Sequence, residues 1–271
     1  SSPSGWQPTY TLYGGADRFS PETPTKMLFL ARKWLKEYPW LNEVAKRKVE
    51  RRLAQPLEDF RIDFEDGYGR RGDEEEDAHA QAVALALPQA QDYRRIGLRL
   101  KPLTRSWATR SLRTLGLAVA GLSVWPSGFC ITLPKLEEAE QVHWLLQHLI
   151  ELEGQRGPIP IEIMVESPRA LRNLESLVGA CSGRCRGLHF GPYDFLASCG
   201  IGSPQLHNPV NVQARAAILL QWSGRGLELA DGPTTTLPLP VHREPKNEQL
   251  QENQKAIRGA WEIGRASCRE R

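Results

Sequence analysis

Short apolar runs alternate along the chain with longer segments in which apolar residues recur at helical spacing. Each run predicts a buried strand, and each longer segment predicts an amphipathic helix. The predicted strands are residues 9–14, 60–65, 96–100, 129–133, 159–165, 187–190 and 227–230. The predicted helices are residues 24–38, 73–87, 105–122, 136–152, 169–178, 212–222 and 245–261. Alternation of this kind is typical of βαβ units built around a parallel sheet.

Seven strand–helix repeats in 271 residues favour an α/β fold of the (β/α)8 TIM-barrel type over an open sheet. Because only seven strands are visible, we expect a C-terminally truncated barrel whose eighth strand is missing. Residues 1–261 are expected to form this single barrel domain, with a natural start upstream of Ser1. Residues 262–271 resemble the translation of a sequencing-library adapter, so we expect this tail to be non-native.

Composition and charge narrow the class of protein further. The chain is 40% hydrophobic and 25% charged, as is typical of a globular protein with a substantial core. Its net charge of +3 is too small to indicate nucleic-acid binding, and the basic stretch 46–52 is interpreted as the solvated face of a helix. No signal peptide or membrane-length apolar stretch is visible, and five cysteines suit a reducing compartment, so we expect a cytoplasmic protein without a membrane partner.

Charged residues stand where most of the predicted strands end. In a βα barrel these ends carry the functional side chains, and converging carboxylates suit Mg²⁺ or Mn²⁺. Taken singly, each of these residues could instead be a helix cap or a surface charge. The sequence contains no zincin histidine pair, no G-x-S-x-G elbow and no phosphate-binding glycine loop. The residues at the strand ends are Asp17, Arg18, Asp63, Glu65, Asp66, Arg99, Lys101, Lys135, Glu166, Asp194 and Asp231.

Five motifs at these ends, taken in order, resemble the HpcH/HpaI aldolase and citrate lyase β-subunit superfamily. They are Arg-Ile-Asp-Phe-Glu-Asp-Gly (61–67), Leu-Arg-Leu-Lys-Pro (98–102), Thr-Leu-Pro-Lys (132–135), Met-Val-Glu-Ser-Pro-Arg (164–169) and Gly-Leu-His-Phe-Gly-Pro-Tyr-Asp (187–194). The similarity extends over residues 11–261 and is closest to an uncharacterised bacterial branch, which shares the longer Arg-Ile-Asp-Phe-Glu-Asp-Gly-Tyr-Gly and Leu-Ala-Asp-Gly-Pro-Thr-Thr segments.

The resemblance implies roles for particular residues. It implies that Glu166 and Asp194 bind a divalent ion, usually Mg²⁺, and that Arg99 grips the carboxylate or carbonyl of the substrate. It also implies that the acidic pair Glu65 and Asp66 holds metal-bound waters. Asp66 stands where the aldolase branch has a catalytic histidine, which favours the lyase-like branch.

Other candidates have less defined roles. Asp66, or a water held by Glu65, is the candidate base, and Lys135 matches a superfamily lysine without a settled role. Arg18 and Asp231 are candidates for substrate binding, although Asp231-Gly-Pro could simply form a turn. A Schiff base on Lys135 or on Lys101, another strand-end lysine, stays open as an alternative.

His189 is interpreted as a packed or hydrogen-bonded histidine rather than a base. It lies within the predicted strand 187–190 rather than at its end.

We therefore expect a Mg²⁺- or Mn²⁺-dependent carbon–carbon lyase or aldolase that works through a metal-stabilised enolate. The expected partner is a small oxo or hydroxy acid or an acyl-coenzyme A thioester. The alternatives are a malate-synthase-like condensation or thioester hydrolysis at the same site, and a non-catalytic metabolite-binding barrel. Since superfamily members often form trimers or hexamers, we expect a homo-oligomer at full length.

Overall fold

The computed structural model describes residues 6–37, 43–202 and 208–232. The predicted helix 245–261 and the predicted non-native tail 262–271 lie outside the described residues.

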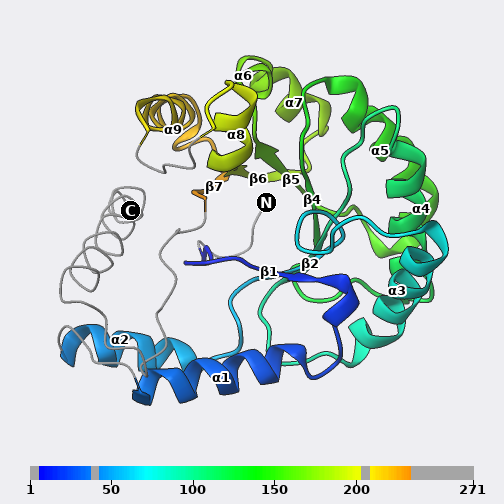
Figure 1. Ribbon diagram of the computed structural model, residues 1–271. Coiled ribbons are helices and arrows are strands. Elements are labelled where there is room, and N and C mark those ends of the chain that lie inside the picture. The colour runs from blue at the N-terminus through cyan, green and yellow to red at the C-terminus, as the bar shows by residue number, and fades with distance from the viewer. Residues whose placement is uncertain (1–5, 38–42, 203–207, 233–271) are drawn as a thin grey trace.

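A single parallel sheet of seven strands in chain order organises the described residues, and it curves with the helices on its outer side (Figure 1). The strands are β1 Leu12–Gly15, β2 Phe60–Asp63, β3 Ile96–Arg99, β4 Cys130–Leu133, β5 Ile161–Val165, β6 Cys185–Phe190 and β7 Glu228–Ala230. Each predicted strand is confirmed, with ends that differ by a few residues. In the part of the chain that the structure describes, strand pairing runs from β1 to β7, which gives an incomplete, barrel-like α/β sheet. An eighth, closing strand stays a prediction.

The helices fill the connections between strands. They are α1 Thr23–Glu37, α2 Glu43–Leu53, α3 Asp73–Ala86, α4 Ala108–Ala118, α5 Ala139–Glu153, α6 Pro168–Arg172, α7 Leu174–Ala180, α8 Pro192–Ser198 and α9 Pro209–Trp222. Short 3-10 turns, η1 Ala16–Arg18, η2 Leu87–Gln89 and η3 Gly154–Arg156, accompany them. The predicted helix 169–178 is divided at Asn173, and α8 was not predicted. No helix among the described residues is long and apolar enough to span a membrane.

Local sequence explains how a typical helix begins and ends. At the start of α5, Glu138 and Gln141 form a capping box that satisfies the first free N–H groups. The helix ends at Gly154, whose φ of 49° is a left-handed conformation that glycine adopts at little cost. The basic stretch 46–52 lies in α2, where most of its side chains are exposed, in agreement with a solvated helix face.

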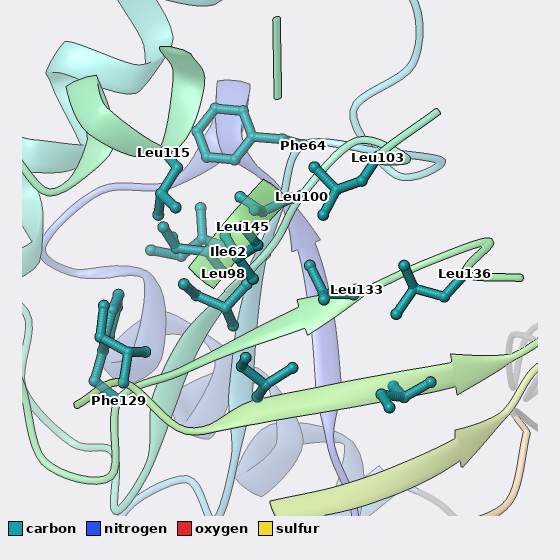
Figure 2. Packing of buried hydrophobic residues seen from close by; sticks show 14 of the residues in the cluster. Ile62, Phe64, Leu98, Leu100, Leu103, Leu115, Phe129, Leu133, Leu136 and Leu145 are labelled. Carbon is teal, nitrogen blue, oxygen red and sulfur yellow. The ribbon is translucent and has the colours of Figure 1, made fainter. Parts of the chain in front are cut away.

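Strand residues alternate between two environments, as the pleat of a strand requires. On β2, Phe60 and Ile62 belong to the apolar cluster between sheet and helices, which Figure 2 shows around Leu98, Leu133 and Leu145. Arg61 and Asp63, which alternate with them, make ion pairs instead.

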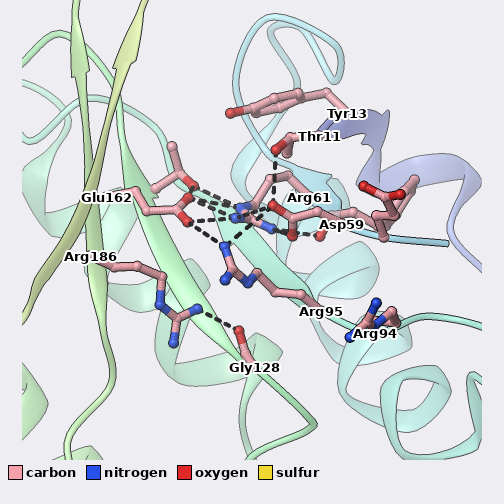
Figure 3. A network of polar contacts seen from close by, with 12 residues as sticks. Thr11, Tyr13, Asp59, Arg61, Arg94, Arg95, Gly128, Glu162 and Arg186 are labelled. Atoms are coloured by element: carbon pink, nitrogen blue, oxygen red, sulfur yellow. Dashed lines mark hydrogen bonds and ion pairs between the residues drawn. The ribbon is translucent and has the colours of Figure 1, made fainter. Parts of the chain in front are cut away.

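The interior of the curved sheet is ionic where barrels are commonly filled by branched apolar side chains. Arg61 is fully buried and donates hydrogen bonds to Asp59 and to Glu162 (Nη2–Oε1 2.7 Å), as Figure 3 shows. It also donates to Thr132 (Nε–Oγ1 2.9 Å). Burial alone would raise the pKa of Glu162, but the charge of Arg61 and the hydrogen bonds from Arg61 and Thr132, together with the neighbouring His189, hold that pKa well below its ordinary value. These contacts tie β2 to β4 and β5 through side chains.

A second arginine crosses the interior in the same way. Arg95, just before β3, forms a bidentate pair with Glu228 on β7, at 2.6 and 2.9 Å. The last strand of the sheet is therefore held to the third by ionic contacts in addition to its pairing with β6.

Replacing Arg61 should be strongly destabilising, because Arg61→Leu leaves the buried Asp59 and Glu162 carboxylates without their main partner. We expect the free energy of unfolding in urea to fall by about 3 kcal/mol or more. The matched control is Arg113→Gln, since Arg113 pairs with Asp77 but its side chain is 59% exposed. The free energy of unfolding of this variant should fall by less than about 1 kcal/mol. Equal losses in the two variants would contradict a structural role for the buried network.

Candidate functional site

Six residues predicted from the sequence form one connected cluster at the carboxyl ends of β2 to β6. Carboxylates and cations alternate in this cluster, and each contact joins residues from different strand–helix units. Its members are Glu65, Asp66, Arg99, Lys135, Glu166 and Asp194.

Asp63 anchors the cluster on the β2 side. Its buried carboxylate accepts two hydrogen bonds from Arg99, Nε–Oδ1 at 2.7 Å and Nη2–Oδ2 at 2.5 Å. It also accepts the backbone N–H groups of Glu65 (2.9 Å) and Gly67 (2.8 Å), which shapes the turn after the strand. A Cβ on Gly67 would lie 2.6 Å from Asp63 Oδ2, so the turn requires glycine there. Asp63 was only one of the strand-end charges in the sequence; its place two residues after Arg61, on the same face of β2, is the signal that could have distinguished it.

Arg99 is held from several sides. Besides Asp63, its Nη1 lies 3.3 Å from Glu65 Oε2 and 3.9 Å from Met164 Sδ, and its guanidinium carbon lies 4.8 Å from the centroid of the Tyr13 ring. Burial disfavours the charged form, but the hydrogen bonds and charge of Asp63 outweigh it and raise the pKa of Arg99 above its ordinary value. Arg99 is therefore a permanent, oriented cation.

Lys135 connects the cluster across three strand–helix units. Its Nζ is paired with Glu65 and lies 3.5 Å from Asp66 Oδ1 and 3.7 Å from Asp194 Oδ1. Its backbone N–H donates to Glu166 Oε2 at 2.8 Å, from a left-handed backbone with φ of 52°. Conformations of this kind in residues other than glycine cluster at functional sites.

The environment of Lys135 bears on the Schiff-base alternative. Burial would lower the pKa of Lys135, but the hydrogen bond and charge of Glu65 outweigh it and raise the pKa above its ordinary value. A charged ammonium cannot attack a carbonyl carbon, so the geometry disfavours a Schiff base on Lys135. Lys101 is buried and donates to the Phe64 carbonyl at 3.1 Å while pairing with Glu76 at 3.1 Å, which suits a structural role.

Glu166 and Asp194 form the part of the cluster with the least charge compensation. Glu166 is only 4% exposed, and burial, together with the charge of Asp194, raises its pKa to about 8. Gly191 makes room for this carboxylate, because a Cβ there would lie 2.5 Å from Glu166 Cγ. Asp194 stands in the first turn of α8 with 39% of its side chain exposed.

These two carboxylates fit a hard divalent ion. Mg²⁺ prefers oxygen ligands and commonly takes one or two protein carboxylates while keeping several waters. Among the described residues, no group of three or more histidine, cysteine, aspartate or glutamate side chains is arranged to hold a metal. The donor set thus suits a cation held by two carboxylates and water rather than a fully enclosed one.

Two predicted substrate-binding residues make their contacts elsewhere. The Arg18 side chain is 89% exposed and lies 3.7 Å from Asp17. Asp231 accepts from Arg215 Nε at 2.7 Å and from the Gly232 backbone at 2.8 Å. The cluster contacts described above do not include either residue, and their role in binding stays a prediction.

Solved structures share this fold at low sequence identity. A citrate lyase from Burkholderia xenovorans LB400 has a TM-score of 0.58 and 21% identity, over 86% of this chain and 67% of that chain. A citrate lyase β subunit from M. tuberculosis, complexed with oxaloacetate and magnesium, has a TM-score of 0.54 and 21% identity, over 94% and 86% of the two chains. A Mycobacterium tuberculosis protein in complex with magnesium and acetoacetate has a TM-score of 0.50 and 22% identity, over 82% and 72%.

The resemblance to citrate lyase β subunits inferred from the five motifs is thus confirmed at the level of the fold. No curated protein matches the chain. A family model described as "Domain of unknown function (DUF6986)" matches residues 2–270, and the chain therefore belongs to that family.

Proposed function

We propose that this protein is a divalent-metal-dependent carbon–carbon lyase or aldolase that acts next to a carbonyl of a small oxo or hydroxy acid or acyl thioester. The observation that carries the proposal is the pairing of an undercompensated carboxylate couple, Glu166 and Asp194, with the buried and oriented Arg99 in one cluster. Two structures that share the fold are described as complexes of magnesium with oxaloacetate or acetoacetate, and this supports an oxo-acid ligand.

Glu166 and Asp194 would hold Mg²⁺, or Mn²⁺, in this proposal. When bound, the cation supplies positive charge that stabilises the negative charge developing on a carbonyl oxygen. Lys135 keeps its contacts with Glu65 and Asp66 and neutralises part of the surrounding negative charge.

Arg99 would bind and orient the substrate carboxylate. Asp63 engages Nε and one side of Nη2, and each terminal nitrogen carries two N–H groups. Nη1 faces Glu65 Oε2 at 3.3 Å and Met164 Sδ at 3.9 Å. In this proposal a substrate carboxylate would pair with the second N–H of Nη2 and with Nη1, in place of the weak Met164 contact, and this bidentate pair would fix its orientation as well as its position.

Asp66 would move the proton at the α-carbon or the hydroxyl group. Its side chain is 59% exposed, whereas Glu65 is buried and engaged by Lys135 and Arg99. A base must reach the proton that it transfers, and Asp66 is the more accessible of the two carboxylates. Glu65, held in place, orients its neighbours or a water.

Several finer features belong to the same proposal. They are an eight-stranded barrel, a homo-oligomer at full length and a cytoplasmic location. The interpretation of residues 262–271 as a non-native segment stays a proposal as well.

Magnesium binding should depend on the carboxylate couple. Calorimetric titration of Mg²⁺ should give one site, and Glu166→Gln or Asp194→Asn should weaken binding by at least about tenfold. Glu175→Gln is the matched control, because the Glu175 side chain is 76% exposed and its ion-pair partner is Arg225. A chain that melts cooperatively yet binds no Mg²⁺ would contradict the metal-dependent reaction and favour a metabolite-binding barrel.

Turnover should depend on the geometry of Arg99. With Mg²⁺ and a panel of hydroxy acids and acyl thioesters, we expect release of pyruvate, glyoxylate or free coenzyme A, depending on the reaction. Arg99→Lys keeps the charge but loses the bidentate geometry, and should lower kcat/KM by about 10- to 100-fold. Unchanged kcat/KM in Arg99→Lys would contradict the proposed carboxylate anchor.

The stability of the metal-free protein should fall with rising pH because of Glu166. Its folded-state pKa of about 8 lies above the ordinary 4.5, so the folded state holds its proton more tightly than the unfolded state. The resulting stability is fully present below pH 4.5 and is lost as the pH rises to about 8. Without divalent ions, the free energy of unfolding in urea should be larger for Glu166→Gln than for the native sequence. The difference should be about 1–4 kcal/mol at pH 9 and much smaller at pH 5. Identical pH dependence in both proteins would contradict the raised pKa.

A further inference from the structure

Tyr13, on β1, lies between the buried interior of the sheet and the candidate site. Its ring centroid is 4.8 Å from the guanidinium carbon of Arg99, within the range of a cation–π contact. Its hydroxyl group is 3.0 Å from Nδ1 of His189 on β6. One side chain therefore contacts both Arg99 and a residue that comes 176 positions after Tyr13 in the chain. Figure 3 shows Tyr13 beside Thr11, next to the Arg61 network.

The hydrogen bond between Tyr13 and His189 has a defined direction. Burial lowers the pKa of His189, so its imidazole is neutral and carries one hydrogen. The Nε2 atom faces Glu162 Oε2 at 3.5 Å, which places that hydrogen on Nε2. Nδ1 is then an acceptor, and the Tyr13 hydroxyl donates to it. Burial also raises the pKa of Tyr13, so the hydroxyl keeps its proton.

Glu162 anchors the far end of this arrangement. It is 1% exposed and accepts hydrogen bonds from Arg61 and from the Thr132 hydroxyl at 2.8 Å. The buried network therefore restrains His189, and His189 in turn restrains the Tyr13 ring.

Arg99 needs a contact of this kind in addition to Asp63. The two hydrogen bonds that Arg99 donates to Asp63 lie along one edge of the guanidinium and fix that edge. Glu65 Oε2 and Met164 Sδ contact Nη1, so these three partners all act on guanidinium nitrogens. The Tyr13 ring adds a contact at the guanidinium carbon, which opposes tilting of the group and keeps the terminal N–H groups in a constant direction.

We propose that Tyr13 is a positioning residue that holds the Arg99 guanidinium in the orientation needed to bind a substrate carboxylate, and that His189 holds Tyr13. The inference rests on the proposed function only for the role of Arg99 towards substrate; the positioning of Arg99 itself does not depend on it.

The first test observes Arg99 directly, without substrate. In ¹⁵N NMR spectra of arginine side chains, the Arg99 Nε–H signal is the one that disappears in Arg99→Lys. We expect the ring current of residue 13 to change the chemical shift of this signal in the native protein and in Tyr13→Phe, which keeps the ring. Tyr13→Leu should abolish this change and accelerate hydrogen exchange at Nε by about tenfold. His189→Leu should give a smaller change in the same direction.

The control variant is Tyr93→Leu, which removes a half-buried tyrosine bridged to the Leu57 segment. It should lower the melting temperature without moving the Arg99 signal, and this separates positioning from general loss of stability. An Arg99 signal and exchange rate that are the same in Tyr13→Leu as in the native protein would overturn the proposal.

The second test measures binding of pyruvate in the presence of Mg²⁺ by calorimetry. Tyr13→Leu should weaken pyruvate binding by about tenfold, Tyr13→Phe should restore most of it, and Mg²⁺ binding should be the same in all three proteins. A changed Arg99 signal supports the positioning whether or not pyruvate binds. If the native protein binds Mg²⁺ but no oxo acid, the proposed function fails while the positioning of Arg99 stands. Weakening of pyruvate binding in Tyr13→Phe as large as in Tyr13→Leu would overturn the role of the ring.

Discussion

The buried Arg61 guanidinium, enclosed by Asp59, Glu162 and Thr132, is the interaction on which the rest of the structure depends. A charge with no access to water must be paired closely, because its desolvation costs several kcal/mol otherwise. The network joins side chains of β2, β4 and β5 across the interior of the curved sheet. Through Glu162 and His189 it also reaches Tyr13 and Arg99, which connects the core of the barrel-like sheet to the candidate site.

The carboxyl ends of the strands hold charged residues of two kinds, a closely paired couple and carboxylates with little compensation. Asp63 and Arg99 satisfy one another with two hydrogen bonds, which makes them rigid. Glu166 accepts the backbone N–H of Lys135, and the ammonium of Lys135 lies 3.7 Å from Asp194. Burial, together with the charge of Asp194, nevertheless raises the pKa of Glu166. Rigid pairs suit the orientation of a substrate, and undercompensated carboxylates suit a cation. Under the proposed function, the cluster would combine the two requirements of enolate-type chemistry within one set of contacts.

Much of the fold could be predicted because strand and helix periodicities differ and because parallel strands must be joined by crossovers. The seven strands were confirmed, and some of the charges at their ends lie in contact, such as Lys135 with Glu65 and Asp194. Other features were not accessible. The short helix α8 has too few residues to show a helical period, and α7, the part after the division at Asn173, packs against α5. Asp63 was not distinguished from its acidic neighbours, since all three stand within one motif.

The sequence by itself determined which residue types stand at the end of each strand and in what order. The reason is that the hydrophobic pattern locates each strand, and the residues that follow it in the chain must lie at its carboxyl end. Only the tertiary structure decided which charges meet. Lys135 joins Glu65, Asp66 and Asp194, and Tyr13 contacts Arg99 and His189 across the interior, whereas Arg18 is exposed. Ion pairing and burial depend on distances between strands far apart in the chain. Those distances arise from the curvature of the sheet, which no local pattern encodes.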